Sequence, residues 1–174
     1  MPVSPINLAD GQRAERKLLI TVVEWNDGTT QQREILGKRT PDSSIEYNSE
    51  IETSTDILGN NYTDLNRTQP SQTFDPYLIL GGSKLGAFLN DIRKRNALSE
   101  LNQFTAYIIT AFTGSAGSYE AEKHTDCTIT YDAIGGDVNV NFPITVHFSN
   151  KITTGTVDKL ADDFTFTEDV TTGP

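Results

Sequence analysis

The sequence predicts a mainly β fold, a sandwich or barrel-like sheet with one amphipathic helix packed against it. Two observations carry this prediction. Apolar and polar residues alternate in several short segments that are bounded by turn-forming residues, a pattern typical of antiparallel strands. Only one segment, about residues 83–96, repeats its apolar residues at helical spacing. The chain of 174 residues is long enough for one domain with a substantial hydrophobic core.

Composition and charge exclude several classes of protein. The net charge of −10 argues against a protein that clamps nucleic acid, because neutralising phosphates needs clustered lysines and arginines. Cys127 is the only cysteine, so no disulfide within the chain is possible. The first residues contain no apolar run typical of a signal peptide, and no segment reaches the length that spans a bilayer. We therefore expect a protein without a membrane partner that stays in the compartment where it is made.

Residues 1–16 are expected to form an extended arm, because they combine prolines, a glycine and mixed charges with few apolar residues. Its apolar anchors are Val3, Ile6 and Leu8. A frayed terminus without a function is the alternative interpretation. The remaining chain divides into a single β-rich domain over residues 17–168 and a loose tail over residues 169–174.

The first part of the domain is expected to be a β-hairpin. Residues 19–25 are apolar on both alternating faces, which predicts a strand buried on both sides. Asn26-Asp27-Gly28 supplies the turn, since Asp and Gly tolerate positive φ. Residues 33–36 return as the second strand, and Pro41 and Asp42 then break the chain.

Residues 43–70 alternate like a long hairpin but have little apolar surface. Regular pleating from Ile45 would place mostly polar side chains on one face, with a turn at Gly59-Asn60 and a return strand from Tyr62 to Thr68. One interpretation is an edge hairpin whose charged face meets water. The other is a hairpin that needs contacts from other subunits, because a two-stranded ribbon that buries little is marginally stable alone. The polar face comprises Glu46, Asn48, Glu50, Glu52, Ser54 and Asp56, with Asp64 and Asn66 on the return strand.

The one clear helix follows Gly81-Gly82, with Ser83 as a suitable N-cap. Its basic end, residues 93–95, complements the helix dipole, and a solvated helix end or an ion pair between subunits explains it better than nucleic-acid binding. The side chains expected to dock on the sheet are Leu85, Phe88, Leu89 and Ile92.

The remainder of the chain is expected to be strands again. Residues 104–112 form a strong buried strand, and the polar residues 113–126 are expected to form a loop. A turn at Gly135-Gly136 leads into a strand that carries Val138, Val140 and Phe142 on one face before Pro143 shifts its register, and it continues to Phe148. Two late strands precede the tail.

No constellation of catalytic residues stands out, so we expect neither an enzyme nor a cofactor. His124, Asp126 and Cys127 lie close in sequence, but their spacing is not that of a structural zinc site, and no metal is expected. Gly81-Gly82-Ser83 lacks the known phosphate-binding patterns and is expected to be an ordinary helix start. His147 is expected to be an ordinary strand histidine.

The order of these segments resembles the tail tube (major tail) proteins of tailed bacteriophages. The resemblance covers most of the chain: the arm with "SPINLADGQ", the long polar stretch, the helix in "GGSKLGAFLNDIRKRNALSEL" and the final "GGDVNVNFPITVHFSNKITTGTVDKL". The segments "TSTDILG", "QTFDPY" and "LNDIRKRNAL" look like those of long non-contractile tails and of prophages from Gram-positive hosts. The family has no catalytic residues whose roles could be assigned to positions of this sequence.

The resemblance implies a β-sandwich with a flanking helix that self-assembles as hexameric rings stacked into a hollow tube. Strands of neighbouring subunits would join into a continuous inner barrel, and arms and a hairpin or loop would bridge successive rings. It further implies a tape-measure protein in the lumen, tail-terminator and baseplate proteins at the ends, and DNA that passes through during ejection without specific binding. The expected location is the virion tail, after synthesis in the bacterial cytoplasm.

Within that resemblance, the polar face of residues 43–70 is expected to line the lumen, where carboxylates would repel DNA phosphates. The alternative is that this stretch bridges rings and that Asn139 and Asn141 line the lumen. Residues 1–12 correspond to the family's N-terminal arm, and residues from Asp162 onward are a candidate second arm. The inner tube of a contractile tail or phage-like bacteriocin is a related alternative. A fibre or adhesin binding module is an alternative of another class, although Tyr47, Tyr62 and Tyr77 are scattered.

Overall fold

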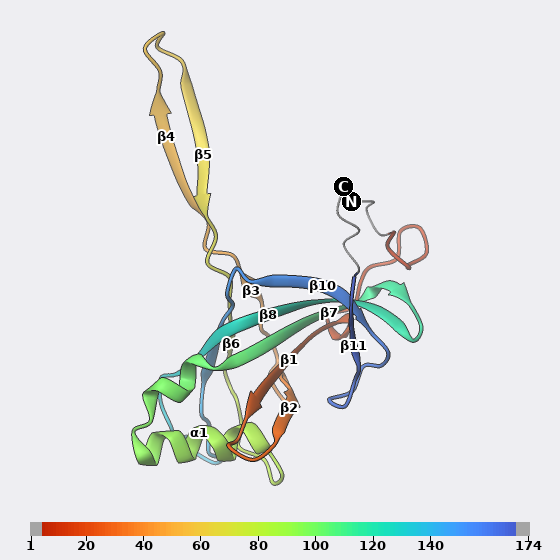
Figure 1. Cartoon of the computed structure of the whole chain (residues 1–174), viewed down its shortest axis with the longest axis vertical. Coiled ribbons are helices and arrows are strands. Elements are labelled where there is room, and N and C mark those ends of the chain that lie inside the picture. The colour runs from red at the N-terminus through yellow and green to blue at the C-terminus, as the bar shows by residue number, and fades with distance from the viewer. Residues whose placement is uncertain (1–4, 170–174) are drawn as a thin grey trace.

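A computed structural model of the chain describes residues 5–169 (Figure 1). It is mainly β, with one α-helix and two 3₁₀ turns among these residues. The elements in chain order are η1 (Arg16–Leu18), β1 (Leu19–Asn26), β2 (Gln31–Ile35), β3 (Ile45–Glu46), β4 (Glu50–Thr55), β5 (Asn61–Arg67), β6 (Ser71–Phe74), α1 (Lys84–Arg95), η2 (Leu98–Asn102), β7 (Phe104–Ser115), β8 (Ser118–Tyr131), β9 (Ile144–His147), β10 (Ile152–Val157) and β11 (Phe166–Glu168).

The body of the molecule is an antiparallel sheet that divides along β8. Its strand order is β2-β1-β7-β8-β9-β6-β3, and β10 and β11 continue from another part of β8. Residues 119–124 of β8 pair with β10, whereas residues 128–131 pair with β9. Asp126, between these two segments, has a φ of 57°, so the strand changes direction there. The two branches therefore diverge and enclose a core, as the predicted sandwich requires.

Hydrophobic residues fill both faces of the central strands. On one face the core includes Val23, and it is closed by α1, whose Leu85, Leu89 and Ile92 are fully buried. Half-buried Phe88 of the same helix stacks on Trp25, with 5.9 Å between ring centroids. On the other face a second core comprises Val22, Tyr107, Ile109, Ala121, Val157 and Phe164.

The first hairpin and the helix form where the sequence predicts them. β1 is buried on both faces, and Asp27 holds the turn by accepting hydrogen bonds from the backbone N–H groups of Thr29 and Thr30. The Ser83 side chain accepts a hydrogen bond from Gly86 N and caps α1. Asn96 ends the helix in the left-handed conformation.

The prediction of a polar loop over residues 113–126 is wrong. β7 extends to Ser115, β8 begins at Ser118, and Gly117 takes a φ of 81° in the tight turn between them. The side chains of this region are polar, yet the β8 backbone pairs with β7 on one edge and with β10 on the other. Backbone pairing with two strands, together with the burial of Ala121 and His124, stabilises a segment whose side chains are mostly polar.

The prediction of a strand carrying Val138 and Val140 is also wrong. Residues 132–143 form a loop held by isolated bridges, and β9 begins only at Ile144. Phe142 is buried, but Val138 is 87% exposed and Val140 is about half exposed. The two glycines at 135 and 136 and Pro143 interrupt the ladder, so apolar alternation alone does not form a strand here.

Residues 5–8 lie against the end of β7, and residues 164–168 belong to the body. Ile6 bridges to Thr113, and Asn7 N donates a hydrogen bond to Phe112 O, so this part of the arm contacts the end of β7. Leu8 is half-buried and Ile6 is exposed, whereas Val3 lies outside the described residues. The idea of a second arm from Asp162 is wrong for residues up to Glu168. There Phe164 is buried in the second core and β11 pairs with β10.

Candidate assembly surfaces

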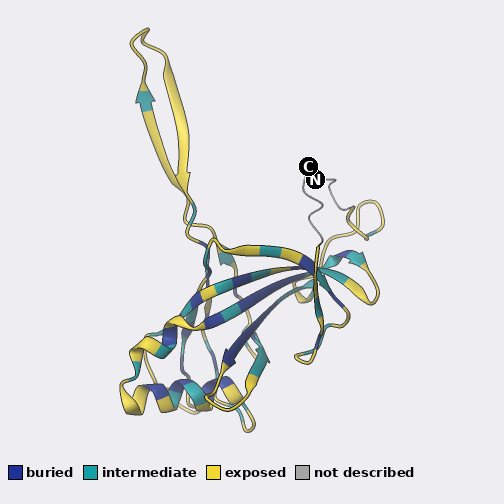
Figure 2. Ribbon diagram, viewed as in Figure 1, coloured by how far each residue is buried: buried dark blue, intermediate teal, exposed yellow. Residues whose placement is uncertain are grey.

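The hairpin of β4 and β5 stands away from the body as a separate two-stranded sheet (Figure 1). Nearly all of its residues are exposed (Figure 2). Two contacts fix its base: Gln69 N donates a hydrogen bond to Tyr47 O at 2.8 Å, and the Asn48 amide donates to Gln69 O at 3.0 Å. The hairpin thus has a defined root but no contact with either core.

The expectation of regular pleating from Ile45 onward is wrong. β3 ends at Glu46, whose partner is Ser71 of the main sheet, and β4 begins at Glu50. Asn48, between them, has a positive φ of 44°. Asn tolerates this left-handed conformation better than most residues. The Asn48 side-chain amide donates hydrogen bonds to Glu46 O and Gln69 O, which hold the break in place. Glu46 and Asn48 therefore do not continue the face of β4.

One face of the hairpin is acidic. Glu50, Glu52 and Ser54 alternate along β4, and Asp64 of β5 lies directly opposite Glu52. The Asn66 amide donates a hydrogen bond to Glu52 Oε2 at 3.1 Å, which places Asn66 on this face also. Like charges directly opposite each other on a ribbon are destabilising. The structure thus gathers five of the eight residues for which a lumen-facing role was predicted.

The opposite face of the hairpin is neutral and partly apolar. Ile51 pairs with Leu65, and Thr53 pairs with Thr63, with 3.3 Å between their hydroxyl oxygens. Ile51 and Leu65 are both exposed. The ribbon therefore presents two chemically different sides, one charged and one suited to packing against another surface.

The tip of the hairpin is apolar and held in shape. Asp56 lies in the turn, and its Oδ1 accepts hydrogen bonds from Leu58 N at 2.8 Å and Asn60 N at 2.9 Å. These hydrogen bonds, led by those from Asn60, lower the pKa of the Asp56 carboxyl. The turn presents Ile57, which is fully exposed, and Leu58, which is 80% exposed. We call Ile57 and Leu58 the tip.

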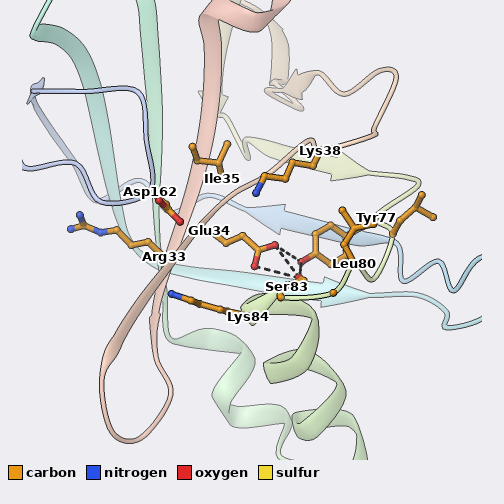
Figure 3. Close-up of a pocket in the computed structure, with 12 residues that line it drawn as sticks. Arg33, Glu34, Ile35, Lys38, Tyr77, Leu80, Ser83, Lys84 and Asp162 are labelled. Carbon is orange, nitrogen blue, oxygen red and sulfur yellow. Dashed lines mark hydrogen bonds between the residues drawn. The ribbon is translucent and has the colours of Figure 1, made fainter.

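At the other end of the molecule, Glu34 of β2 organises a small pocket beside the start of α1 (Figure 3). Its carboxylate accepts hydrogen bonds from Tyr77 Oη at 2.9 Å, Ser83 Oγ at 3.1 Å and Leu85 N at 3.0 Å. Burial and the Glu34 charge raise the pKa of Tyr77. The Glu34 carboxylate already accepts a hydrogen bond from the Leu85 N–H at the N-terminus of α1. The helix N-terminus is therefore not free to bind another anion in this pocket.

Cationic side chains surround this pocket of about 140 Å³. Lys38 and Lys84 lie on either side of Glu34 (Figure 3), and Arg33 and Asp162 also line it. Arg33 is held by an ion pair with Glu24 and stacks over Phe164 at 4.4 Å. Within residues 5–169, neither of the two lysines forms an ion pair.

The other residues considered for chemistry are dispersed. His124 is buried in β8, with Nδ1 2.9 Å from Ser149 O, while Asp126 pairs with Lys151 and the Cys127 thiol donates to His124 O. Burial raises the pKa of Cys127. No three metal-ligating side chains converge in the part of the chain that the structure describes. His147 lies in β9 near the Thr130 hydroxyl.

Arg95 of the basic triplet and Asn141 of the 132–143 loop are engaged within the chain. Arg95 forms ion pairs with Asp91 and Glu100. Asn141 accepts a hydrogen bond from Tyr77 N and donates one to Asp75, so it ties two loops together. Asn139 lies in the exposed part of this loop. None of the helices among residues 5–169 is long and apolar enough to cross a membrane.

Two exposed apolar sites were not predicted from the sequence: the tip, and the 132–143 loop with Val138 and Val140. The signal for the tip was present, because two large aliphatic residues directly before Gly59 are unusual in a solvated turn. The signal for the loop was misread, since Val138 and Val140 alternate as a buried strand would.

Comparisons with known proteins add a distant likeness. No family model matches the sequence, and a search of curated proteins gave no significant match. Among solved structures, the chain is similar to one from the sheath–tube complex of an extracellular contractile injection system, PVC, in its extended state. The alignment covers 79% of this chain and 88% of that chain, at 15% identity and a TM-score of 0.42. A likeness of this degree carries no argument about function.

Proposed function

We propose that this chain is a structural protein that assembles into stacked hexameric rings, the tube of a phage tail or a related injection machine. The observation that carries the proposal is the projecting hairpin of β4 and β5, whose residues contact neither core. A two-stranded ribbon that buries no apolar face is marginal by itself, so it gains stability from a partner surface. The resemblance of the sequence to tail tube proteins makes that partner another copy of the same chain.

The acidic face of the hairpin suits the lumen of such a tube. Glu52 and Asp64 would repel phosphates and give moving DNA nothing to bind, whereas Glu50 forms an ion pair with Arg67 at the base of the hairpin. Ser54 and Asn66 share their face, whereas Glu46 and Asn48 lie before the break that precedes β4 and Asp56 lies in the turn. The neutral face, with Ile51 and Leu65, would then pack against protein.

The chain's partners in this role are other copies of itself, a tape-measure protein in the lumen, and terminator and baseplate proteins at the tube ends. Its location would be the virion tail, and its activity would be structural rather than catalytic. An inner tube of a contractile tail or phage-like bacteriocin is the second form of the same proposal. A fibre or adhesin module is the competing class, and it predicts a monomer or a small closed oligomer.

The mass of the assembly in solution tests this proposal. Native mass spectrometry and sedimentation velocity of the purified chain should show a species of six copies and higher multiples of six. Reversing charge at Glu50 and Glu52 should leave this mass unchanged if their face borders the lumen. A monomer at every concentration would favour the fibre or adhesin module.

A further inference from the structure

The hairpin of β4 and β5 joins the body through a narrow root (Figure 1). β3 pairs with β6 in the main sheet, and β4 pairs with β5 in the hairpin. We call residues 47–49 and 68–70, which lie between these two ladders, the root. Within residues 5–169, one backbone hydrogen bond crosses the root, from Gln69 N to Tyr47 O at 2.8 Å. A ribbon joined in this way can change direction while both ladders stay paired.

Asn48 holds the entry side of the root. Its φ of 44° turns the chain between β3 and β4, and its side-chain amide donates hydrogen bonds to Gln69 O at 3.0 Å and to Ser71 Oγ at 3.1 Å. The exit side is held differently, because Phe148 N donates a hydrogen bond to Pro70 O at 2.9 Å. One side chain therefore sets the direction in which the hairpin projects, while the exit strand stays fastened to the body.

A pocket of about 460 Å³ lies between the root and the loop that follows β9. The root side of the pocket is lined by Asn48, Thr68 and Gln69, and the loop side is lined by Ser149 and Asn150. This space is far larger than the voids of a packed protein interior. The hairpin therefore has room to move toward the loop.

The loop side of the pocket is fixed to the sheet. Ser149 O lies 2.9 Å from Nδ1 of buried His124, and Lys151 N donates a hydrogen bond to Ser149 Oγ at 3.1 Å. The buried Phe148 ring lies 5.2 Å from the His124 ring, measured between centroids. The hairpin, by contrast, has no contact with either core. Of the two sides of the pocket, the hairpin is therefore the one that can move.

We propose that the root is a hinge, and that the hairpin swings about Asn48 toward residues 148–150 and closes the pocket. The structure shows the upright position. In the leaning position the side chains of Thr68 and Gln69 meet those of the loop, and hydroxyl and amide groups can both donate and accept hydrogen bonds.

Leaning exchanges one set of hydrogen bonds for another. The upright position has those of the Asn48 amide, and the leaning position has those across the pocket. The two positions therefore differ little in free energy, and both are populated. A hinged ribbon presents its acidic face and its neutral face at two angles. The hinge is a property of the single chain and holds whether or not copies assemble.

Double electron–electron resonance between two nitroxide labels measures the swing. Leu58→Cys places one label in the tip, and Ile152→Cys places the other at the start of β10, just after the loop. Both positions are exposed, whereas the natural Cys127 is fully buried. Labelled chains are diluted in an excess of unlabelled chain, so each measured distance belongs to one chain in any assembly. The natural root should give two distances, of which the shorter belongs to the leaning position.

Two variants should shift this balance in opposite directions. Asn48→Gly still allows a positive φ but removes the side-chain hydrogen bonds of the upright position. It should raise the ratio of short to long distances about fivefold, the factor that one net hydrogen bond supplies. Asn150→Ala removes a partner of the leaning position and should lower that ratio by a similar factor. Asn139→Ala, in the 132–143 loop, is the matched control and should leave the ratio unchanged.

All three substituted side chains are exposed, so the variants should keep the circular dichroism spectrum of the natural chain. A single narrow distance that Asn48→Gly leaves unchanged would mean that the root is rigid, and would overturn the hinge. A broad distribution that Asn150→Ala leaves unchanged would also overturn it, because the hairpin would then be a flexible tether without a second position. Failure of the chain to form rings would remove the proposed function and leave the hinge intact.

Discussion

Glu34 is the residue at which β2, the Tyr77 loop and α1 meet. Its carboxylate accepts hydrogen bonds from two hydroxyl groups and one backbone N–H group. Hydrogen bonds to a charged acceptor are stronger than neutral ones, and the Leu85 N–H at the helix start has no partner within the helix. Glu34 therefore fixes α1 against the sheet and, through Tyr77, fixes the loop that follows β6.

Replacing Glu34 by alanine should lower the free energy of unfolding by about 2 kcal/mol, because three donors lose their acceptor. Urea denaturation followed by circular dichroism measures this. Glu15→Ala is the control, since Glu15 is exposed and pairs only with Lys17. Equal effects of the two substitutions would show that the Glu34 contacts contribute nothing beyond a surface charge.

Tyr107 makes stability depend on pH in the alkaline range. Burial and the nearby Glu24 charge raise the pKa of Tyr107 to about 12, above its ordinary value of 10.0. The folded state thus favours the neutral phenol, and between these values the unfolded state binds fewer protons. Stability from this group is complete below pH 10 and should be lost as the pH rises toward about 12. Tyr107→Phe should flatten that decline in pH-dependent unfolding, and an unchanged slope would contradict the assignment.

At the scale of elements, α1 and β1 were predictable because each carries its own signal. Ser83 caps the helix. Leu85, Leu89 and Ile92 recur at helical spacing, so the helix has a single apolar face that packs against the core. β8 was not predictable in the same way. Its polar residues are held by backbone pairing with β7 and β10. These strands come to lie beside β8 only when the whole sheet forms, so the local sequence of β8 does not reveal the pairing. The break at Asn48 likewise depends on its contacts with Gln69 and Ser71.

The hairpin should be dispensable for folding and required for stacking. Replacing residues 50–67 by a two-residue Asn-Gly turn is geometrically feasible, because Gln69 N and Tyr47 O are only 2.8 Å apart at the root. We expect the unfolding temperature to stay within about 3 °C, since the hairpin contributes nothing to either core. Differential scanning calorimetry measures this. A large fall would mean that the hairpin supports the body.

At the scale of the molecule, self-assembly explains features that a monomer leaves without a role. The tip is apolar and exposed, Glu52 and Asp64 face each other, and Val138 and Val140 are open to water. Each of these features is unfavourable or neutral in a single chain and useful between copies. The sequence could predict that partners are needed, but not which surfaces meet, because that depends on which loops share an end of the fold.

The N-terminal arm is expected to act in tube assembly rather than in folding. Deleting residues 1–12 removes the bridge from Ile6 to Thr113 but no residue of either core. The shortened chain should fold with an unchanged circular dichroism spectrum and should no longer form long tubes. Tubes of normal length from this deletion would show that the arm has no part in assembly.

Self-assembly into a tube can be tested by negative-stain electron microscopy of the purified chain across a concentration series, with light scattering alongside. We expect rings at low concentration and hollow tubes at high concentration for the natural chain, and single rings for the chain that lacks residues 50–67. A monodisperse monomer at the highest concentration would contradict self-assembly into a tube, and tubes from the chain without its hairpin would contradict the role of the hairpin in stacking.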